Sequence, residues 1–194
     1  MRVFLRSSRF FIVVIAALVI ALISAAPITA AAQSAAEPKT WTVTPFLNTS
    51  LSTSNDLGNS LGLGVAIGYD LTAALGFEGE LGHAFDFLGD DANLDWSITN
   101  VSANVVYHFD VPRVTPYATF GLGIERSSLG VKVPDPAALY PAPTTEITYN
   151  LGGGVKYPVS ERFLARADVR LFQANDAAPD YWRLYGGLTW WIKR

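Results

Sequence analysis

Apolar and polar residues alternate along most of the chain instead of recurring with a helical period. The clearest case is 145–157, where odd positions include Ile147 and Leu151 and even positions include Glu146 and Asn150. Side chains of a strand point alternately to opposite faces, so this period of two predicts β-strands. Such segments recur between Gly, Pro, Asn and Asp residues. The pattern predicts eight strands, at 41–51, 60–70, 74–85, 96–109, 114–126, 145–157, 163–173 and 181–192.

The predicted connections alternate in length. Three are short, at 70–73, 110–113 and 158–162, and four are long, at 52–59, 86–95, 127–144 and 174–180. Short turns on one rim and long loops on the other are typical of outer-membrane barrels. We therefore predict an all-β fold, an eight-stranded antiparallel up-and-down transmembrane β-barrel. It occupies residues 41–194 and follows a short N-terminal extension at 33–40.

The two faces of the predicted strands differ in character. In the second strand, Leu61, Leu63 and Val65 alternate with Gly62 and Gly64. A soluble carrier such as a lipocalin is the alternative barrel, but it requires large apolar residues inside and charges in water. An apolar face toward lipid and a small or charged face toward a narrow lumen gives every residue a suitable neighbour. The sequence therefore favours the membrane barrel.

The predicted inner face carries a network of charged residues. Its members are Glu78, Glu80, Glu125, Lys156, Arg166, Asp168 and Arg170. A bore of eight strands is just wide enough for side chains to fill, so we expect a plug, with an ion pathway as the alternative. The third and seventh strands are opposite in such a barrel. This predicts pairing of Glu78 and Glu80 with Arg166 and Arg170, and the alternative is pairing between adjacent strands, such as Lys156 with Asp168.

Aromatic residues gather near both ends of the predicted strands. Near the short turns lie Trp41, Tyr69, Tyr107, Phe109, Tyr157, Phe163 and Trp190, and near the long loops lie Phe85, Trp96, Phe172, Tyr181 and Trp182. Two such rings are typical of the membrane interfaces. The alternative is that aromatic residues are simply common in strands.

The N-terminal segment has the pattern of a secretory signal peptide. Three arginines precede an uncharged run over 10–36 that contains Pro27 and ends in small residues. Ala30 and Ala32 fit the site that signal peptidase accepts, which predicts removal of residues 1–32. An uncleaved membrane anchor is the alternative, since the apolar run is long enough to span a bilayer.

Composition narrows the chemistry. The 194 residues include no cysteine, which excludes a disulfide scaffold, a thiolate metal site and a cysteine nucleophile. Without the three N-terminal arginines, the chain has eleven basic residues against seventeen acidic ones. A balance of this sign offers no basic stripe for nucleic acid. We expect no nucleic-acid partner and no cofactor.

Histidine and serine offer the few candidates for catalysis. His83 and His108 fall at opposite rims and on opposite faces, so they do not predict a shared metal site. His83 and Ser97 both have outward parity, and Asp86 or Asp95 is near. A nucleophile, a base and an orienting carboxylate are conceivable there, as in an enzyme that modifies lipid A.

The whole predicted barrel resembles a known family. The glycine-rich runs 61–69 and 120–123 and the closing segment 184–191 are similar to the outer membrane protein beta-barrel domain family, the OmpA-like group. The resemblance implies a location in the cell outer membrane of a Gram-negative envelope. It also implies contact with the lipid bilayer and lipopolysaccharide, and with the barrel-assembly machinery during biogenesis. Relatives are known for an ion-pair gate across the lumen.

We expect a structural or surface-interaction role through the long extracellular loops, which would meet an unknown extracellular ligand, and we do not expect an enzyme. The alternatives are a small low-conductance or gated channel for ions or small solutes, and a lipid A-modifying enzyme.

Overall fold

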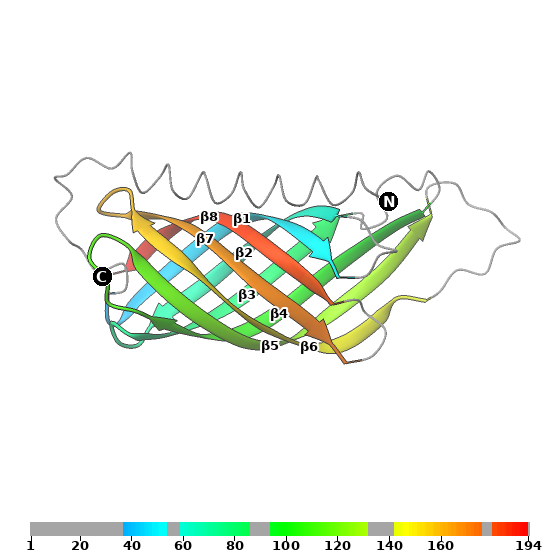
Figure 1. Ribbon diagram of the computed structural model, residues 1–194, viewed down its shortest axis with the longest axis horizontal. Coiled ribbons are helices and arrows are strands. Elements are labelled where there is room, and N and C mark those ends of the chain that lie inside the picture. Colours follow the sequence, from blue (N-terminus) through cyan, green and yellow to red (C-terminus); the bar gives the residue numbers. More distant parts are fainter. Residues whose placement is uncertain (1–36, 54–58, 86–93, 132–141, 176–179, 194) are drawn as a thin grey trace, which may run out of the picture. The chain divides into compact units, whose positions relative to one another are not determined.

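The chain forms a closed barrel of eight antiparallel strands in the computed structural model, which describes residues 37–53, 59–85, 94–131, 142–175 and 180–193. Each strand pairs with its neighbours in sequence, and the last pairs with the first (Figure 1). The strands are β1 (Thr40–Ser52), β2 (Asn59–Asp70), β3 (Leu75–Phe85), β4 (Leu94–His108), β5 (Thr115–Val131), β6 (Thr144–Pro158), β7 (Phe163–Ala174) and β8 (Tyr181–Lys193). The predicted fold class is confirmed. In the described ranges, no helix has the length and hydropathy of a membrane span.

The predicted strand bounds agree with the structure to within two residues, except at the end of β5. The sequence places that end at residue 126, whereas the strand continues to Val131. The extension pairs with the start of β4, from Leu94 opposite Val131 to Thr99 opposite Arg126. The hairpin of β4 and β5 therefore continues further toward the long-loop end than the apolar alternation in its sequence predicts. The predicted signal peptide and most of each long loop lie outside the described residues.

The three short turns share one end of the barrel, on the left in Figure 1. They join β2 to β3, β4 to β5 and β6 to β7, and the start of β1 lies at the same end. Both rims are thus built as the alternation of short and long connections predicts.

The outside of the barrel is apolar. Large hydrophobic side chains such as Leu47, Leu61 and Leu151 are 62–72% exposed. Their sequence neighbours point inward, and Asn48, which follows Leu47, is only 4% exposed. This arrangement is the reverse of a soluble carrier, so the barrel requires a hydrocarbon surrounding.

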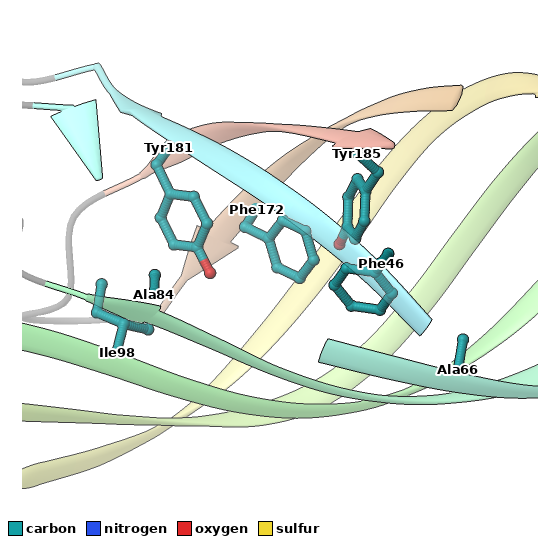
Figure 2. Packing of buried hydrophobic residues seen from close by; sticks show 7 residues of the cluster. All are labelled: Phe46, Ala66, Ala84, Ile98, Phe172, Tyr181 and Tyr185. Carbon is teal, nitrogen blue, oxygen red and sulfur yellow. The ribbon is translucent and has the colours of Figure 1, made fainter. Parts of the chain in front are cut away.

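An apolar cluster fills the inside toward the long-loop end. Its members are Phe46, Ala66, Ala84, Ile98, Phe172, Tyr181 and Tyr185 (Figure 2). Trp96 packs against this cluster. The rings of Phe172 and Tyr181 stack with centroids 5.2 Å apart. We predicted Phe172, Tyr181 and Trp96 to face the membrane interface, and this is wrong. Their parity along the strand turns them inward, and nearness to a loop does not override that parity.

Two inward glycines of β6 let β7 approach closely. A Cβ on Gly152 would lie 2.1 Å from the carbonyl oxygen of Val169, and a Cβ on Gly154 would lie 2.3 Å from that of Ala167. Backbone atoms cannot move aside as a flexible side chain can. The glycines therefore keep β7, which carries the charged residues described next, tight against its neighbour.

Candidate functional site

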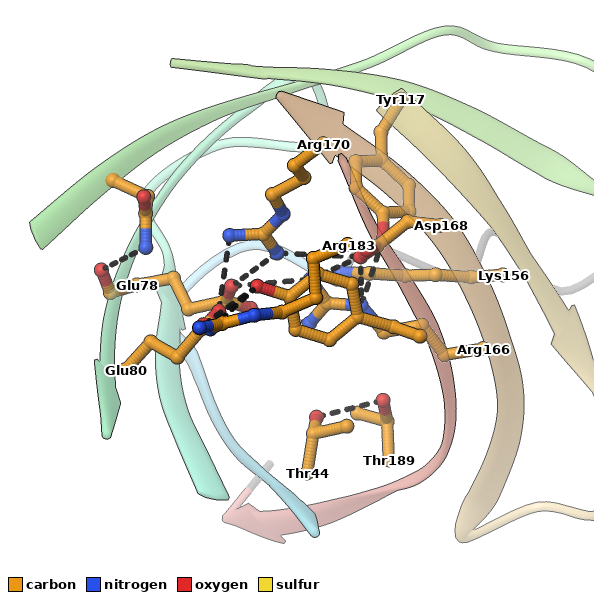
Figure 3. Close-up of polar contacts among 12 residues, drawn as sticks. Thr44, Glu78, Glu80, Tyr117, Lys156, Arg166, Asp168, Arg170, Arg183 and Thr189 are labelled. Atoms are coloured by element: carbon orange, nitrogen blue, oxygen red, sulfur yellow. Dashed lines mark hydrogen bonds and ion pairs between the residues drawn. The ribbon is translucent and has the colours of Figure 1, made fainter. Parts of the chain in front are cut away.

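The centre of the lumen holds six charged side chains from three strands. β3 contributes Glu78 and Glu80, β7 contributes Arg166, Asp168 and Arg170, and β8 contributes Arg183, as drawn in Figure 3. We call these six residues the central charge cluster. All are at most 7% exposed. Three carboxylates thus face three guanidinium groups in the buried interior.

The Glu78 carboxylate accepts hydrogen bonds from two arginines on the opposite side of the barrel. Arg166 approaches with Nη1 2.5 Å from Oε2 and Nη2 3.1 Å from Oε1. Arg170 Nη2 donates to the same Oε1 at 3.1 Å. β3 and β7 are four strands apart in the closed order, so these bonds cross the whole bore. In a forked guanidinium–carboxylate pair, two charge-assisted hydrogen bonds act together, which adds both energy and geometric specificity.

Glu80 joins the second half of the cluster. Its Oε2 accepts from Arg170 Nη1 at 3.0 Å, and its Oε1 lies 3.3 Å from Arg183 Nη1. The hydroxyl of Tyr185 donates to Oε1 at 2.7 Å. Arg170 therefore bridges the two glutamates and links all members into one network.

Asp168 stabilises the arginines from their own strand. Its Oδ2 accepts from Arg166 Nη2 at 2.9 Å and from Arg170 Nη2 at 3.2 Å. Tyr117 on β5 donates its hydroxyl to the same oxygen and accepts from Arg166 Nε at 2.8 Å. Two guanidinium groups held side by side need such a carboxylate, because without it they repel each other.

Aromatic rings cover the guanidinium planes. Arg170 lies 4.8 Å from the ring centre of Tyr185, and Arg183 lies 4.4 Å from that of Phe172. Cation–π contacts at these distances add to the ion pairs where water is excluded. The two rings thus stabilise the guanidinium groups of Arg170 and Arg183 in addition to their ion pairs.

Glu125 and Lys156 sit outside the centre. Glu125 lies toward the long loops and accepts from the Tyr181 hydroxyl at 2.7 Å, and Tyr181 in turn accepts from Arg183 Nη2 at 2.9 Å. Lys156 lies toward the short turns, with Nζ 2.9 Å from His108 Nε2. His108 is buried on the inner face of β4, opposite to the face that carries His83, as the alternation in the sequence predicts.

Arg183 belongs to the central charge cluster but was absent from the charge network predicted from the sequence. Trp182 and Leu184 on either side are apolar, so the alternation that placed the other charges inside also applies to this residue. Tyr117 and Tyr185 were likewise left out. These tyrosines are lumenal hydrogen-bonding partners, and their inward parity was the available signal.

The predicted interfacial aromatics of the short-turn end lie on the outside, and six of the seven form three ring pairs. Trp41 and Tyr69 rings are 4.9 Å apart, and those of Tyr107 and Phe109 are 5.2 Å apart. Phe163 and Trp190 stack across β7 and β8, and Tyr157 is partly exposed. At the other end Phe85 and Trp182 remain outward, 48% and 43% exposed.

Of the candidate catalytic residues, the structure describes the side chains of His83 and Ser97. His83 Nδ1 lies 2.7 Å from the hydroxyl of Thr99, its register partner, and Ser97 is two residues further along β4. Asp86 and the side chain of Asp95 lie outside the described residues. Within the described residues, no three His, Cys, Asp or Glu side chains are placed to hold a metal ion.

An eight-stranded antiparallel barrel with an apolar outside, aromatic rims and a charged inside is a transmembrane β-barrel of the outer-membrane class. The chain belongs to the outer membrane protein beta-barrel domain family, which matches residues 15–188. It is an outer-membrane β-barrel protein. No curated protein sequence is significantly similar to it.

Solved barrels share this architecture. Neisserial surface protein A has a TM-score of 0.62 at 18% identity, over 78% of this chain and 96% of that chain. The N-terminal barrel domain of Pseudomonas aeruginosa OprF has 0.56 at 19%, over 79% and 98%. OprG from Pseudomonas aeruginosa has 0.57 at 11%, over 83% and 99%. At such identities the likeness establishes the fold alone.

Proposed function

We propose that the protein is a closed outer-membrane barrel that acts structurally or by surface interaction through its long extracellular loops. The observation that carries the proposal is the balance of the central charge cluster. Its three carboxylates and three guanidinium groups are mutually paired and buried across the bore. Every charged side chain of this layer has an ion-pair partner of opposite sign, so the layer is neutral and offers a passing ion no unpaired charged group to bind. The loops are then the part of the protein available to a partner.

The partners follow from this location. They are the lipid bilayer with its lipopolysaccharide, the barrel-assembly machinery during biogenesis, and an unidentified extracellular ligand at the loops. Neither nucleic acid nor a cofactor is part of the proposal, and the protein is not an enzyme. Export by a signal peptide cleaved after residue 32 is part of it. Mass spectrometry of the protein from the outer-membrane fraction tests the cleavage, and an intact residue 1 would favour an anchor.

Single-channel recording on the refolded protein tests the closed lumen. We expect no steady conductance from the unaltered barrel across a planar bilayer. Discrete openings in the unaltered protein would contradict the proposal and favour a small channel for ions or solutes. A mass shift of lipid A caused by the protein, and lost in His83→Ala, would instead favour a lipid-modifying enzyme.

A further inference from the structure

A second polar layer crosses the lumen closer to the short-turn end than the central charge cluster. It consists of Asp70 on β2, His108 on β4 and Lys156 on β6, which lie at or near the short-turn ends of their strands. All three residues are at most 5% exposed. β2 and β6 are four strands apart in the closed order, so this layer joins opposite sides of the bore through His108. We call these three residues the lower layer.

The imidazole ring of His108 has a charged residue at each of its two nitrogens. Its Nε2 lies 2.9 Å from Lys156 Nζ, and its Nδ1 lies 3.9 Å from Asp70 Oδ1. An ammonium group has three N–H donors and no acceptor, so a charged Lys156 donates and Nε2 accepts. The proton of the neutral ring is then on Nδ1, the nitrogen next to Asp70. The lower layer thus combines a cation, a neutral imidazole and an anion.

The charged and titratable groups around the imidazole come from five strands. Among the described residues they are Asp70 on β2, Glu78 on β3, Tyr117 on β5, Lys156 on β6 and Arg166 on β7. Glu78 and Arg166 are paired with each other, and the Tyr117 hydroxyl accepts from Arg166. The groups that contact the ring nitrogens are therefore those of Lys156 and Asp70.

A proton on His108 reverses the contacts of the lower layer. Once Nε2 carries a proton, it no longer accepts from Lys156, and two positive charges face each other across a 2.9 Å contact. Like charges at that separation repel strongly in a buried site. On the other side, the imidazolium and the Asp70 carboxylate become an ion pair. Asp70 Oδ2 and His108 Nδ1 have no hydrogen-bond partner among the described residues, so both have bonding capacity left for this pair.

We propose that the lower layer is a proton-operated latch of the lumen. At neutral pH, His108 holds the Lys156 ammonium in the bore. Acidification exchanges that bond for the ion pair between His108 and Asp70, and it releases Lys156. Histidine is suited to this role because its charge changes in the physiological pH range, whereas the arginines of the central charge cluster keep theirs.

The released ammonium has an alternative position close by. The centre of the Tyr117 ring lies 5.5 Å from Lys156 Nζ, within reach of a cation–π contact. Lys156 carries its charge on a flexible four-carbon side chain, so it can leave His108 without a change in the backbone of β6. The inference goes beyond the proposed function, because it adds a pH-dependent layer to the closed lumen.

Nuclear magnetic resonance of the side-chain nitrogens tests the latch in the mature barrel in lipid nanodiscs. The chain has two histidines, and His83→Gln assigns their signals. At pH 7.5 we expect His108 to carry its proton on Nδ1. On acidification, the Lys156 Nζ signal should shift with the same midpoint as the His108 signals. A neutral ring protonated on Nε2, or a Lys156 signal that does not respond when His108 takes up its proton, overturns the proposal.

Two variants should move the midpoint in opposite directions. Lys156→Met removes the repelling cation, so it should raise the pH at which His108 takes up a proton by at least about one unit. Asp70→Asn removes the attracting anion and should lower it. Arg162→Gln is the matched control, because it removes an exposed cation from the same end of the barrel, and the midpoint should stay unchanged. An equal shift in Arg162→Gln and Lys156→Met would contradict the latch.

The result is separable from that of the closed-lumen proposal. The position of the His108 proton is read in the unaltered protein, so the test holds even where a variant does not fold. Discrete openings in planar bilayers would refute the closed lumen without moving that proton. A His108 ring protonated on Nε2 would refute the latch and leave the central charge cluster paired.

Discussion

Neutralising Glu78 and Arg166 separately and together measures the bond across the lumen. The sequence alone suggests a charge swap, with Glu78→Arg rescuing Arg166→Glu. The structure makes that rescue incomplete, because the new arginine would face Arg170 at the 3.1 Å contact and the new glutamate would face Asp168 at the 2.9 Å contact. Glutamine at both positions avoids these repulsions.

The expected magnitudes follow from the contacts. Glu78→Gln removes a carboxylate that accepts three charge-assisted hydrogen bonds, and it leaves two buried guanidinium groups with one carboxylate fewer. Breaking one buried partner costs about 3 to 5 kcal/mol of unfolding free energy. Arg166→Gln should cost about 3 kcal/mol, the lower end, because Arg170 remains beside both Glu78 and Asp168.

The double variant removes both members, so its loss should be smaller than the sum of the single losses by roughly 2 to 3 kcal/mol. Urea unfolding of the barrel in lipid vesicles, followed by tryptophan fluorescence, gives the four free energies. Additive losses would show that no coupling exists across the bore and would refute the reasoning.

The same variants should change conductance. Each single replacement unbalances the central charge cluster, so we expect brief openings in planar bilayers that the unaltered barrel lacks. Thr44→Val is the matched control, because it removes a lumenal hydrogen bond to Thr189 of 2.8 Å without touching a charge. If Thr44→Val opened the lumen as readily as Glu78→Gln, packing rather than charge would close the bore.

Three further predictions address the wall and its orientation. Val65→Arg, near the middle of the lipid-facing side of β2, should cost about 2 to 4 kcal/mol of unfolding free energy in a bilayer. Ala66→Arg, on the inner face, should prevent folding by overfilling the lumen in thick and thin bilayers alike. Tolerance of Val65→Arg, measured by the folding yield in vesicles, would mean that this face is not in lipid. Gly154→Ala should cost about 1 to 3 kcal/mol because the added carbon meets the β7 backbone, and Gly186→Ala, where a Cβ meets nothing within 4 Å, should be close to neutral in the same urea titration. A peptide tag inserted near Ala138 should bind antibody on intact cells, and labelling only after permeabilisation would reverse the topology.

Many of the residues that line the lumen could be predicted from the sequence. The alternation shows which residues point inward, and the position of a residue along its strand shows how far it lies from the short-turn end. Alternation turned Glu78, Glu80, Arg166 and Arg170 inward, and an even, closed strand order put β3 opposite β7. The contacts themselves depend on side-chain length. Arg166 and Arg170 are long enough to reach across a bore of eight strands, and that reach follows from the barrel size.

The remaining contacts depend on details that alternation does not carry. The side chain of Lys156 contacts His108 on β4, two strands away. The alternation shows only that Lys156 points inward, and it does not show which side chain in the lumen becomes its partner. The sequence interpretation placed Tyr181 at the membrane interface because it lies near a loop. With Tyr181 taken as outward, Arg183, two residues later on the same face of β8, was not recognised as lumenal. A strict use of parity in β8 would have turned both inward. The extension of β5 to Val131 escaped notice because its outward residues, Ser128 and Gly130, are not apolar.

The register of β5 shows why the two sets of charges stay apart. Glu125 points inward to Tyr181, and the very next residue, Arg126, is exposed on the outer face of the barrel. A slip of one residue would put Phe120 and Ile124 into the filled bore and turn Glu125 toward the membrane. Both changes are unfavourable, because the filled lumen has no space for these two side chains and the bilayer gives a carboxylate no partner. The apolar alternation of this strand therefore fixes both the inward position of Glu125 and the outward position of Arg126 by a single choice of register.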